Sequence, residues 1–398
     1  MPAEKVRFVI KAMPADENVP QALPGTMQPH PLVHQELAHD PEFGLYNHRL
    51  ISLSMKDVTP DEMYWKVRCE AGLRHTGERA LEIRGVDAPR LLNRVFTREV
   101  GKTKVGRCSY QFACFDDGGM ITDGVLVRLA EDRFWFGQAE GDLLSWIKAL
   151  ALGLDVAVGD PGGWISQVQG PNALKILEAA VDGAYPEPFR YFDAAEVTIA
   201  GQPVVITRTG FTNELGWEFY LDPATDREAI GERILEAGRP FGLVPIAAFG
   251  ARRIEAGLLN AGSDFDHATT PFAAGLGNLV DFDKGDFVGR RALTGADRSQ
   301  RVWGLQVEAG VAAVGGTLER DGAPAGLVSS SAWSPYQRCG VALVRMETAE
   351  HQEGGHLDVA CTDGATRPGT LCETPMYDKD RLIPRGKVVD IPVREPSP

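Results

Sequence analysis

The chain has 398 residues, of which 43% are hydrophobic, so it is long enough for two or three domains with cores of their own. Its formal net charge of -14 repels nucleic acid and anionic membrane surfaces. The longest apolar stretch, residues 143–158, is interrupted by Lys148, Gly153 and Asp155, and it predicts a buried helix and a strand rather than a membrane span.

The first 45 residues are rich in proline and show neither helical nor alternating periodicity. They predict an extended N-terminal arm laid over the body of the protein, with regular structure starting after Tyr46. The segment lacks the apolar core and cleavage site of a secretory signal, so we expect a cytoplasmic location. The six cysteines show no C-x-x-C spacing, which predicts free thiols and no metal site.

Two similar strand-to-helix units predict duplicated α+β halves. Residues 80–84 alternate like a strand and lead into a helix with an apolar face, and residues 165–169 lead into a second such helix. Asp87 and Asn172 occupy the positions at which a side chain commonly caps a helix.

The rest of the body alternates predicted strands and helices up to about residue 294, where the pattern changes. Strands are expected at 124–129, 133–137, 204–207 and 217–221, and helices at 140–152 and 226–237. Short strands then follow at 302–307, 316–319, 326–329, 341–344 and 357–360, with an Asp321-Gly322 hairpin signal. The expected organisation is an arm over 1–45, two α+β domains over 46–165 and 166–296 that interleave, and an all-β domain over 297–398.

Several common cofactor motifs are absent from the sequence. No G-x-G-x-x-G follows a predicted strand, and neither a G-x-x-x-x-G-K-[ST] loop nor an H-E-x-x-H segment occurs. The sequence therefore contains no motif that supports dinucleotide binding, P-loop nucleotide hydrolysis or zinc-protease chemistry. The cofactor must be of another kind.

The strongest local signal is the segment GGMITDGVLV at residues 118–127, which is preceded by Tyr110 and an acidic turn. It places Asp123 at the mouth of a predicted strand. A carboxylate held there can pair with a cationic centre or orient a ring nitrogen, which is electrostatic catalysis when positive charge develops nearby. Taken alone, an aspartate in such a segment is more often a turn residue, so the pattern by itself leaves both roles open for Asp123.

Further segments carry a family resemblance. They read VQGPNA at 168–173, RTGFTNELGWE at 208–218, RIEAGLL at 253–259, TTPF at 269–272 and DFVGRRAL at 286–293. With the Asp123 segment they resemble, in the same order, the motifs of the aminomethyltransferase (glycine-cleavage T-protein) superfamily over residues 46–386. Within this superfamily, the chain most resembles the dimethylsulfoniopropionate demethylase branch. The resemblance lies in residues 46–48, 105–110, 134–136 and 252–259.

This resemblance implies a three-domain cloverleaf around a central folate channel, with two related α+β domains and a small all-β C-terminal domain. It also implies tetrahydrofolate as cofactor and methyl transfer to its N5. By position, Asp123 matches the family's catalytic aspartate near N5. Glu218 matches the glutamate that binds the pterin, and Tyr110 matches an aromatic residue that lines the channel. A carboxylate suits the adjacent N–H donors of a pterin edge because it can accept both in a fork.

Several positions depart from the motifs of related enzymes. Arg74 stands where T-proteins of glycine cleavage have an aspartate and Phe249 where they have an arginine, which counts against that function. Gln138 lies near the asparagine of their N-A-A-N segment and is a candidate cofactor ligand. Phe211 and Ala261 replace a tryptophan and a tyrosine of the sulfoniopropionate enzymes, so an aromatic surface for a sulfonium cation is reduced. The methyl donor stays open.

The expected activity is tetrahydrofolate-dependent demethylation of a small donor, either a methoxyaromatic acid or a sulfonium compound, which gives 5-methyltetrahydrofolate. Tyr46, His48 and His75 are candidates to protonate a phenolate leaving group. Phe211, Trp135 and His75 are candidate substrate contacts.

Arg252 and Arg253 are candidates for binding the glutamate tail of folate or a substrate carboxylate, since the chain is otherwise acidic. Two alternative functions are aminomethyl transfer in glycine cleavage, which needs a lipoyl carrier protein, and folate binding without turnover. We expect no metal, nucleic acid or membrane partner, and the sequence leaves a homo-oligomer open.

Overall fold

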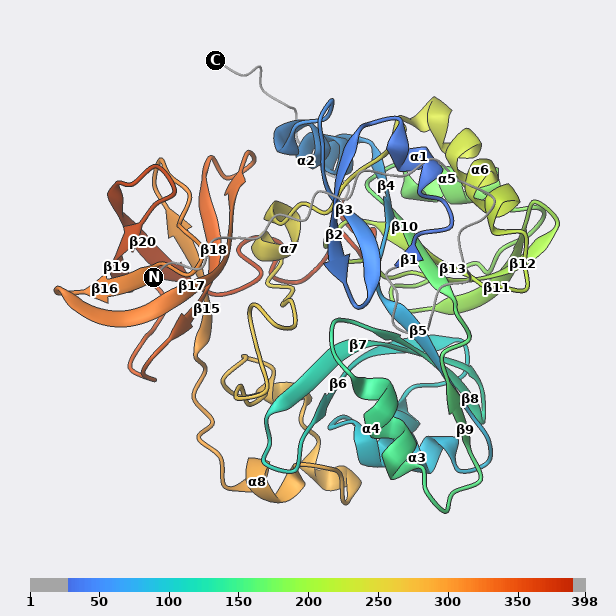
Figure 1. Cartoon of the computed structure of the whole chain (residues 1–398), viewed down its shortest axis with the longest axis horizontal. Coiled ribbons are helices and arrows are strands. Elements are labelled where there is room, and N and C mark those ends of the chain that lie inside the picture. Colours follow the sequence, from blue (N-terminus) through green and yellow to red (C-terminus); the bar gives the residue numbers. More distant parts are fainter. Residues whose placement is uncertain (1–27, 389–398) are drawn as a thin grey trace.

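The computed structural model describes residues 28–388, and these form three lobes (Figure 1). Two lobes combine helices with a sheet, and the third, made by the C-terminal residues, is a β-barrel. The α+β fold with a small all-β C-terminal domain is therefore confirmed. No helix within residues 28–388 is long and apolar enough to cross a membrane.

The first lobe consists of β5 (Arg79–Arg84), α3 (Ala88–Val95), η1 (Val100–Lys102), β6 (Arg107–Cys114), β7 (Met120–Ala130), β8 (Arg133–Gln138), α4 (Leu143–Leu150) and β9 (Ala157–Gly159). Its strands form one sheet in the order β6-β7-β8-β5-β9. The apolar faces of α3 and α4 cover one side of this sheet and bury Phe134 and Phe136 there. The other side is left to meet the second lobe.

The second lobe consists of β4 (Ala71–His75), β10 (Trp164–Gln169), α5 (Ala173–Ala180), β11 (Ala194–Ile199), β12 (Gln202–Thr207), β13 (Gly216–Leu221), α6 (Arg227–Gly238), η2 (Arg239–Phe241) and β14 (Leu243–Pro245). Its sheet has the order β11-β12-β13-β10-β4-β14, and α5 and α6 pack on one side. Strand β4 precedes the first lobe in the chain but lies between β10 and β14. The two halves therefore interleave in the chain.

Neither residue predicted to cap a helix does so. Asp87 Oδ2 accepts a 2.9 Å hydrogen bond from the N–H of Asp155, and Asn172 Nδ2 donates at 3.0 Å to the carbonyl of Phe241. At both positions ψ is near 0°, so the side chain does not turn back to the first free N–H groups as it does from an extended N-cap. Both polar groups instead tie the helix start to a neighbouring loop.

The N-terminal part contains β1 (Gln28–Pro29), α1 (His34–Leu37), β2 (Pro41–Tyr46), β3 (Arg49–Met55) and α2 (Pro60–Cys69). Regular structure therefore begins before Tyr46, contrary to the prediction, because β2 is fixed by pairing with β3 rather than by its own weak pattern. The two turn residues, Asn47 and His48, have φ of 53° and 63°, as in a tight hairpin of the type I′ class. Residues 1–27 of the predicted arm lie outside the described part.

The C-terminal lobe is a closed barrel in the order β15-β18-β17-β16-β19-β20. Its strands are β15 (Val302–Val307), β16 (Thr317–Arg320), β17 (Ala323–Ser334), β18 (Cys339–Met346), β19 (His356–Ala360) and β20 (Thr366–Cys372). The Asp321-Gly322 hairpin is confirmed, with φ of 53° and 75°. The last strand was not predicted because Pro368 and Gly369 disfavour a strand locally, but β15 and β19 pair with it and close the barrel.

The connection from the second lobe to the barrel runs through α7 (Ala251–Glu255), η3 (Gly277–Leu279), η4 (Phe282–Lys284) and α8 (Arg290–Thr294). Phe265, Phe272 and Phe287 of this connection pack with Phe112 of β6 and Val341 of β18. The connection therefore joins the first lobe and the barrel through a shared core.

The two sheets meet through an apolar layer that we call the inter-sheet core. Its buried members come from both sheets, and the rings of Trp135 on β8 and Tyr220 on β13 lie 5.6 Å apart there. The other members are Ala80, Cys108, Val127, Ile165 and Val205. Because side chains alternate along a strand, every second residue of β7 and β13 faces this layer or its continuation.

Candidate functional site

A row of polar residues crosses the second sheet on the side that faces the first. Arg74 on β4 pairs in register with Gln167 on β10, which pairs with Glu218 on β13, which pairs with Thr207 on β12. Directly paired residues point to the same side of a sheet. By strand alternation this side is the one that contributes to the inter-sheet core, so the row continues that layer with polar groups.

Glu218 occupies the middle of this row. Its Oε2 accepts a 2.5 Å hydrogen bond from Thr209 Oγ1, and the neighbouring Gln167 Oε1 accepts the backbone N–H of Phe211 at 3.2 Å. Burial raises the pKa of Glu218 to about 7, and the bond from Thr209 opposes the rise. Near neutral pH, Glu218 is therefore close to the midpoint between its protonated and ionised forms.

Asp123 lies on β7, in the facing sheet, and is 5% exposed. Its Oδ2 accepts a 2.7 Å hydrogen bond from the phenol of Tyr110 on β6, whereas its Oδ1 has no partner within the described residues. Burial raises the pKa of Asp123 to about 6, and the phenol opposes the rise. Burial and the nearby carboxylate raise the pKa of Tyr110, so its hydroxyl stays a donor.

The two carboxyl groups share one electrostatic environment. In addition to burial, the Glu78 carboxylate raises the pKa of both Asp123 and Glu218. Burial, Glu78 and Asp123 together raise the pKa of Tyr46, while Arg74 lowers the pKa of Tyr46 and of Glu218. Since charge interactions fade over roughly 10 Å at physiological salt, these mutual effects indicate that the five side chains lie in one neighbourhood.

The tip of the β2–β3 hairpin borders this region. Tyr46 Oη accepts a 3.2 Å hydrogen bond from the N–H of Glu140, and Asn47 Nδ2 donates to the carbonyl of Gln138 at 3.3 Å. Gln138 Nε2 donates back to Asn47 Oδ1 at 3.4 Å, so Gln138 braces the hairpin. His48, which the sequence suggested as a proton donor, is exposed at the turn.

His75 points away from the carboxyl groups, because it follows Arg74 on β4 and successive strand residues face opposite sides. Its two ring nitrogens lie 2.9 Å from Ser166 Oγ and 3.1 Å from Gln35 Oε1, and its ring stacks on His30. Burial lowers the pKa of His75 to about 3, so the ring is neutral. His75 thus anchors the N-terminal part to the second sheet.

The two predicted aromatic contacts are placed differently. Trp135 fills the inter-sheet core, with its indole N–H donated to Glu82 Oε1 at 3.3 Å, so its ring faces protein on both sides. Phe211 is half-buried, and its backbone N–H donates to Gln167, which stands next to Glu218 in the polar row. Of the two, Phe211 is the better placed to touch a bound molecule.

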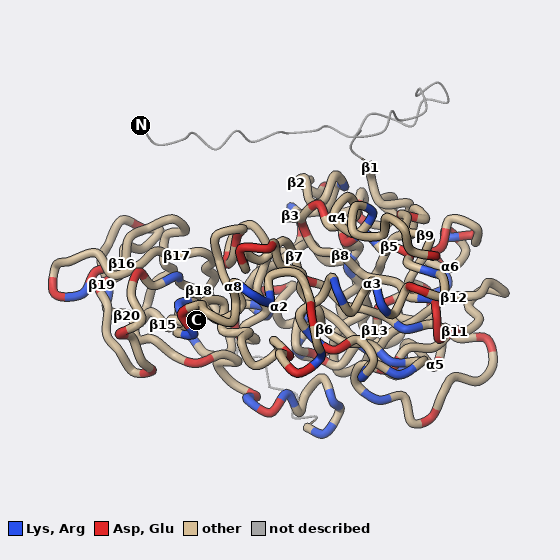
Figure 2. The backbone as a smooth tube through the Cα atoms, turned by 90° about the horizontal axis from the view of Figure 1, so that it is seen from below, with Lys and Arg blue, Asp and Glu red and all other residues tan. Residues whose placement is uncertain are grey.

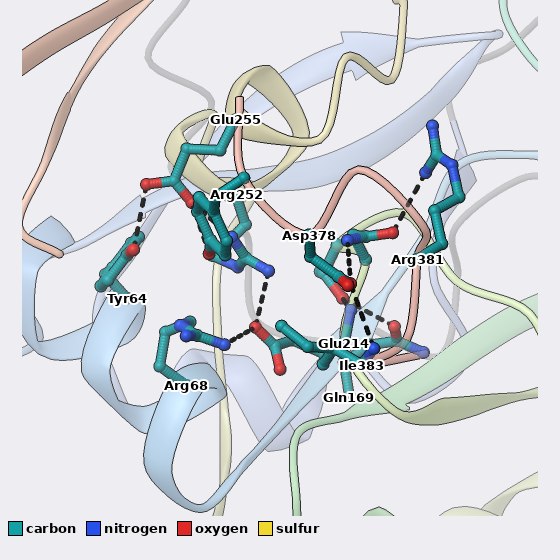
Figure 3. A network of polar contacts seen from close by, with 12 residues as sticks. Tyr64, Arg68, Gln169, Glu214, Arg252, Glu255, Asp378, Arg381 and Ile383 are labelled. Carbon is teal, nitrogen blue, oxygen red and sulfur yellow. Dashed lines mark hydrogen bonds and ion pairs between the residues drawn. The ribbon is translucent and has the colours of Figure 1, made fainter. Parts of the chain in front are cut away.

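Arg252 and Arg253, which the sequence suggested for binding an anion, both pair with carboxylates of the protein. Arg252, 1% exposed, forms ion pairs with Glu214 at 2.7 Å and with Glu255. Figure 3 shows that Arg68 contacts the same oxygen of Glu214 as Arg252 does, at 2.8 Å, and that Tyr64 is bonded to Glu255 at 3.0 Å. This buried network joins α2, α7 and the loop before β13.

Arg253 is occupied in a similar way. Its guanidinium forms an ion pair with Asp264 at 2.7 Å and donates at 2.7 Å to Ser330 Oγ of the barrel strand β17. In this structure the guanidinium of Arg253 therefore joins the connection to the barrel. The reason is that Asp264 lies beside it in the fold, 11 residues along the chain, which no local pattern announces.

Comparison with known proteins identifies the family. The GCVT N-terminal domain profile matches residues 45–284 and the glycine cleavage T-protein C-terminal barrel domain profile matches residues 300–378. The chain belongs to the glycine cleavage T-protein family. A solved aminomethyltransferase T of Bartonella henselae has the same fold, with a TM-score of 0.79 and 23% identity over 88% of this chain and 98% of that one.

Curated relatives carry several names. The chain is 34% identical to a trimethylamine-oxide aldolase of Ruegeria pomeroyi over 85% of its own length, but it spans only 46% of that protein. It is 32% identical to an aminomethyltransferase of Streptomyces avermitilis, covering 84% of this chain and 96% of the relative. It is 28% identical to a dimethylsulfoniopropionate demethylase of Ruegeria pomeroyi, covering 83% and 92%.

This is a family of tetrahydrofolate-dependent one-carbon transferases, and tetrahydrofolate is the cofactor. The residues around Asp123 fit it. Within residues 28–388, three buried polar atoms of the side chains that act on these carboxyl groups have no hydrogen-bond partner, namely Asp123 Oδ1, Glu78 Oε2 and Arg74 Nε. Buried polar groups are normally paired, so two acceptors and one donor here match a heterocycle with N–H donors and a ring carbonyl.

Sequence reasoning did not single out Glu78, Gln167 or Thr209. Gln167 had a signal, because Gln167 and Gln169 place polar side chains at every second position of a strand that also carries Trp164, Ile165 and Val168. Glu78 and Thr209 lie just outside strands, in segments without periodicity. Their place in the site follows from the pairing of β4, β10 and β13.

Proposed function

We propose that this protein is a tetrahydrofolate-dependent demethylase that moves a methyl group from a small methylated donor to N5 of the cofactor. The observation that carries the proposal is the pair of buried carboxyl groups, Asp123 on one sheet and Glu218 on the facing sheet, around one region with unpartnered polar atoms. The demethylase relative supports the reaction type. Arg74, in the polar row where T-proteins of glycine cleavage have an aspartate, counts against aminomethyl transfer.

Each carboxyl group has a separate task in this reaction. Glu218, steadied by Thr209, would accept N–H groups of the pterin edge and fix its orientation. The cofactor supplies N5 as the nucleophile that takes the methyl carbon as the bond to the donor breaks. Alignment of the two bound molecules accounts for much of the rate of such a displacement.

Asp123 would stabilise the positive charge that grows at N5, because a preorganised carboxylate in a water-poor site acts strongly on developing charge. Tyr110 holds Oδ2, so the unpartnered Oδ1 is the oxygen that would take the proton released from N5. The electron pair of the broken bond stays on the donor. If that leaves a phenolate, Tyr46 could donate a hydrogen bond to it, because the bond that Tyr46 accepts from the Glu140 N–H leaves its own hydrogen free.

The test is incubation of the pure protein with tetrahydrofolate and a panel of sulfonium compounds and methoxyaromatic acids, with folate products read by mass spectrometry. Formation of 5-methyltetrahydrofolate with one donor class is the expected result. Formation of 5,10-methylenetetrahydrofolate would replace the proposal by transfer of the glycine-cleavage kind. Folate binding without any product across the panel would instead favour a binding protein without turnover.

A further inference from the structure

A tail follows the barrel and returns to the second lobe. We use this name for residues 373–388, the described residues after β20, which are red in Figure 1. The tail meets residues 208–215, which we call the β12–β13 loop. This loop carries Thr209, which bonds to Glu218, and Phe211, which bonds to Gln167. The tail therefore contacts the loop that borders the polar row.

Asn213 in the β12–β13 loop is held by the tail at both ends of its amide. Its Nδ2 donates to Asp378 Oδ2 at 3.2 Å, and its Oδ1 accepts a 3.1 Å hydrogen bond from Arg381 Nη1. Asn213 is 5% exposed and has a φ of 58°, a left-handed conformation that asparagine adopts more readily than most residues. The tail thus satisfies a buried amide at the point where the loop turns.

The tail presents these two groups in a fixed geometry. Asp378 Oδ1 and Oδ2 accept the backbone N–H groups of Leu382 and Ile383 at 2.7 Å and 3.1 Å, so the carboxylate closes a turn of the tail (Figure 3). Arg381 Nη2 donates at 3.2 Å to the carbonyl of Ala256, directly after α7. The turn is therefore anchored to the connection as well as to the β12–β13 loop.

Hydrogen bonds continue from the residue beside Asn213 to Glu218. Thr212 Oγ1 donates to Gln169 Oε1 at 2.7 Å, and Gln169 Nε2 donates to the carbonyl of Thr209 at 3.1 Å. The hydroxyl of Thr209 in turn donates to Glu218 Oε2. Thr212, Gln169 and Thr209 are buried, so water does not readily replace a bond that is lost between them. The placement of the turn at Asn213 is therefore passed on to Glu218.

We propose that the tail is a strap that holds the β12–β13 loop in the shape in which Glu218 binds the pterin edge, with Asn213 and Asp378 as positioning residues. Both act through Thr209 and not on the cofactor itself. Affinity for the cofactor then depends on a contact between residues 165 positions apart in the chain. The inference rests on the proposed function in one respect, namely that Glu218 holds the ring of tetrahydrofolate.

The first variant is Asn213→Gly, because glycine keeps the left-handed backbone without strain and removes only the amide. We expect tetrahydrofolate to bind about fivefold more weakly at equilibrium, which is part of what a hydrogen bond to a charged partner supplies. The KM for tetrahydrofolate should rise by the same factor while kcat stays within about twofold, since Asp123 is unaltered. A variant that merely lost stability would lower the active fraction, and with it kcat, and would leave KM unchanged.

Asp378→Gly removes the same contact from the side of the tail. The double variant should bind tetrahydrofolate about as weakly as the weaker single variant, because both substitutions act on one contact. The matched control is Asp321→Gly in the exposed barrel hairpin, since Asp321 and Asp378 have the same φ of 53° and lose the same charge. Figure 2 shows the two signs of charge interspersed along the chain, so the loss of one carboxylate at either position changes the overall distribution little. The control should bind as the unaltered protein does.

Unchanged affinity of Asn213→Gly, or a loss of kcat without a change in affinity, would overturn the inference and leave the demethylase proposal standing. Equal losses of affinity in Asp378→Gly and Asp321→Gly would overturn it as well. If tetrahydrofolate binds but no donor gives a product, the demethylase proposal alone fails, because the equilibrium affinities still test the strap. Absence of tetrahydrofolate binding by the unaltered protein would overturn both.

Discussion

The phenol of Tyr110 donates a 2.7 Å hydrogen bond to Oδ2 of Asp123 across two neighbouring strands of the first sheet. This bond favours the ionised carboxylate, whereas burial favours the protonated one. Burial has the larger effect, so the pKa of Asp123 rises to about 6 despite the bond. In the proposed reaction, the acidic limb of the pH profile of kcat/KM should therefore depend on the hydrogen bond from Tyr110.

Replacing Tyr110 by phenylalanine should move that limb. Without the phenol the carboxylate loses a charged hydrogen bond, which corresponds to a rise of about one pH unit in the pKa of Asp123. In the pH profile of kcat/KM, which reports groups of the free enzyme, the acidic limb should shift upward from about 6 while the plateau persists. A profile that keeps its midpoint would show that Asp123 does not control it.

Replacing Asp123 by asparagine should separate chemistry from binding. The amide keeps the shape but carries no charge, so kcat should fall by about two orders of magnitude or more, as when a preorganised electrostatic group is removed. Tetrahydrofolate affinity, measured by equilibrium binding, should change little because Glu218 still holds the ring. Turnover close to that of the unaltered protein would remove Asp123 from the mechanism.

Replacing Glu218 by glutamine should stabilise the free protein in a pH-dependent manner. Because the folded-state pKa of Glu218 is about 7, above its ordinary value, its contribution to stability is complete at low pH and is lost as pH rises through about 7. The variant should therefore melt about 2 °C or more above the unaltered protein at pH 8.5, and at nearly the same temperature at pH 4.5.

The same variant should bind tetrahydrofolate about tenfold more weakly, because a neutral acceptor replaces a charged one. Glu236→Gln, at an exposed position on α6, serves as the control and should alter neither measurement. A melting difference that is equal at both pH values would contradict the titration of Glu218.

The buried network in Figure 3 should be sensitive to the loss of one carboxylate. Glu214→Gln leaves Arg68 and Arg252, 4% and 1% exposed, without their shared anion. Removing one partner of a buried pair costs about 3 kcal/mol or more, and urea denaturation should show this as a lower midpoint. Glu353→Gln breaks an exposed pair with Lys379 and should cost less than about 1 kcal/mol. Equal midpoints for the two variants would mean that the network adds no net stability.

Local sequence was enough for several parts of the structure. The two strand-to-helix units, the Asp321-Gly322 hairpin and most barrel strands follow from periodicity and turn residues, which act over a few residues. The glycines and the family resemblance of the segment around Asp123 pointed to this residue, and its role stays a prediction. Asp123 lies inside β7 and not at the start of a strand, contrary to the prediction. Strand β20 did not follow, since Pro368 disfavours it and only barrel closure fixes it.

Which faces meet was decided by the tertiary structure alone. Arg74 and His75 are neighbours in the sequence, yet β4 directs one toward Glu218 and the other into the contact with the N-terminal part. Likewise, the fold brings Arg253 into an ion pair with Asp264, which no local pattern indicates. The sequence by itself determined which side chains share a face, because that depends on the pitch of one strand or helix. The pairing of distant strands determined which faces enclose the cofactor, because it depends on burial summed over the whole chain.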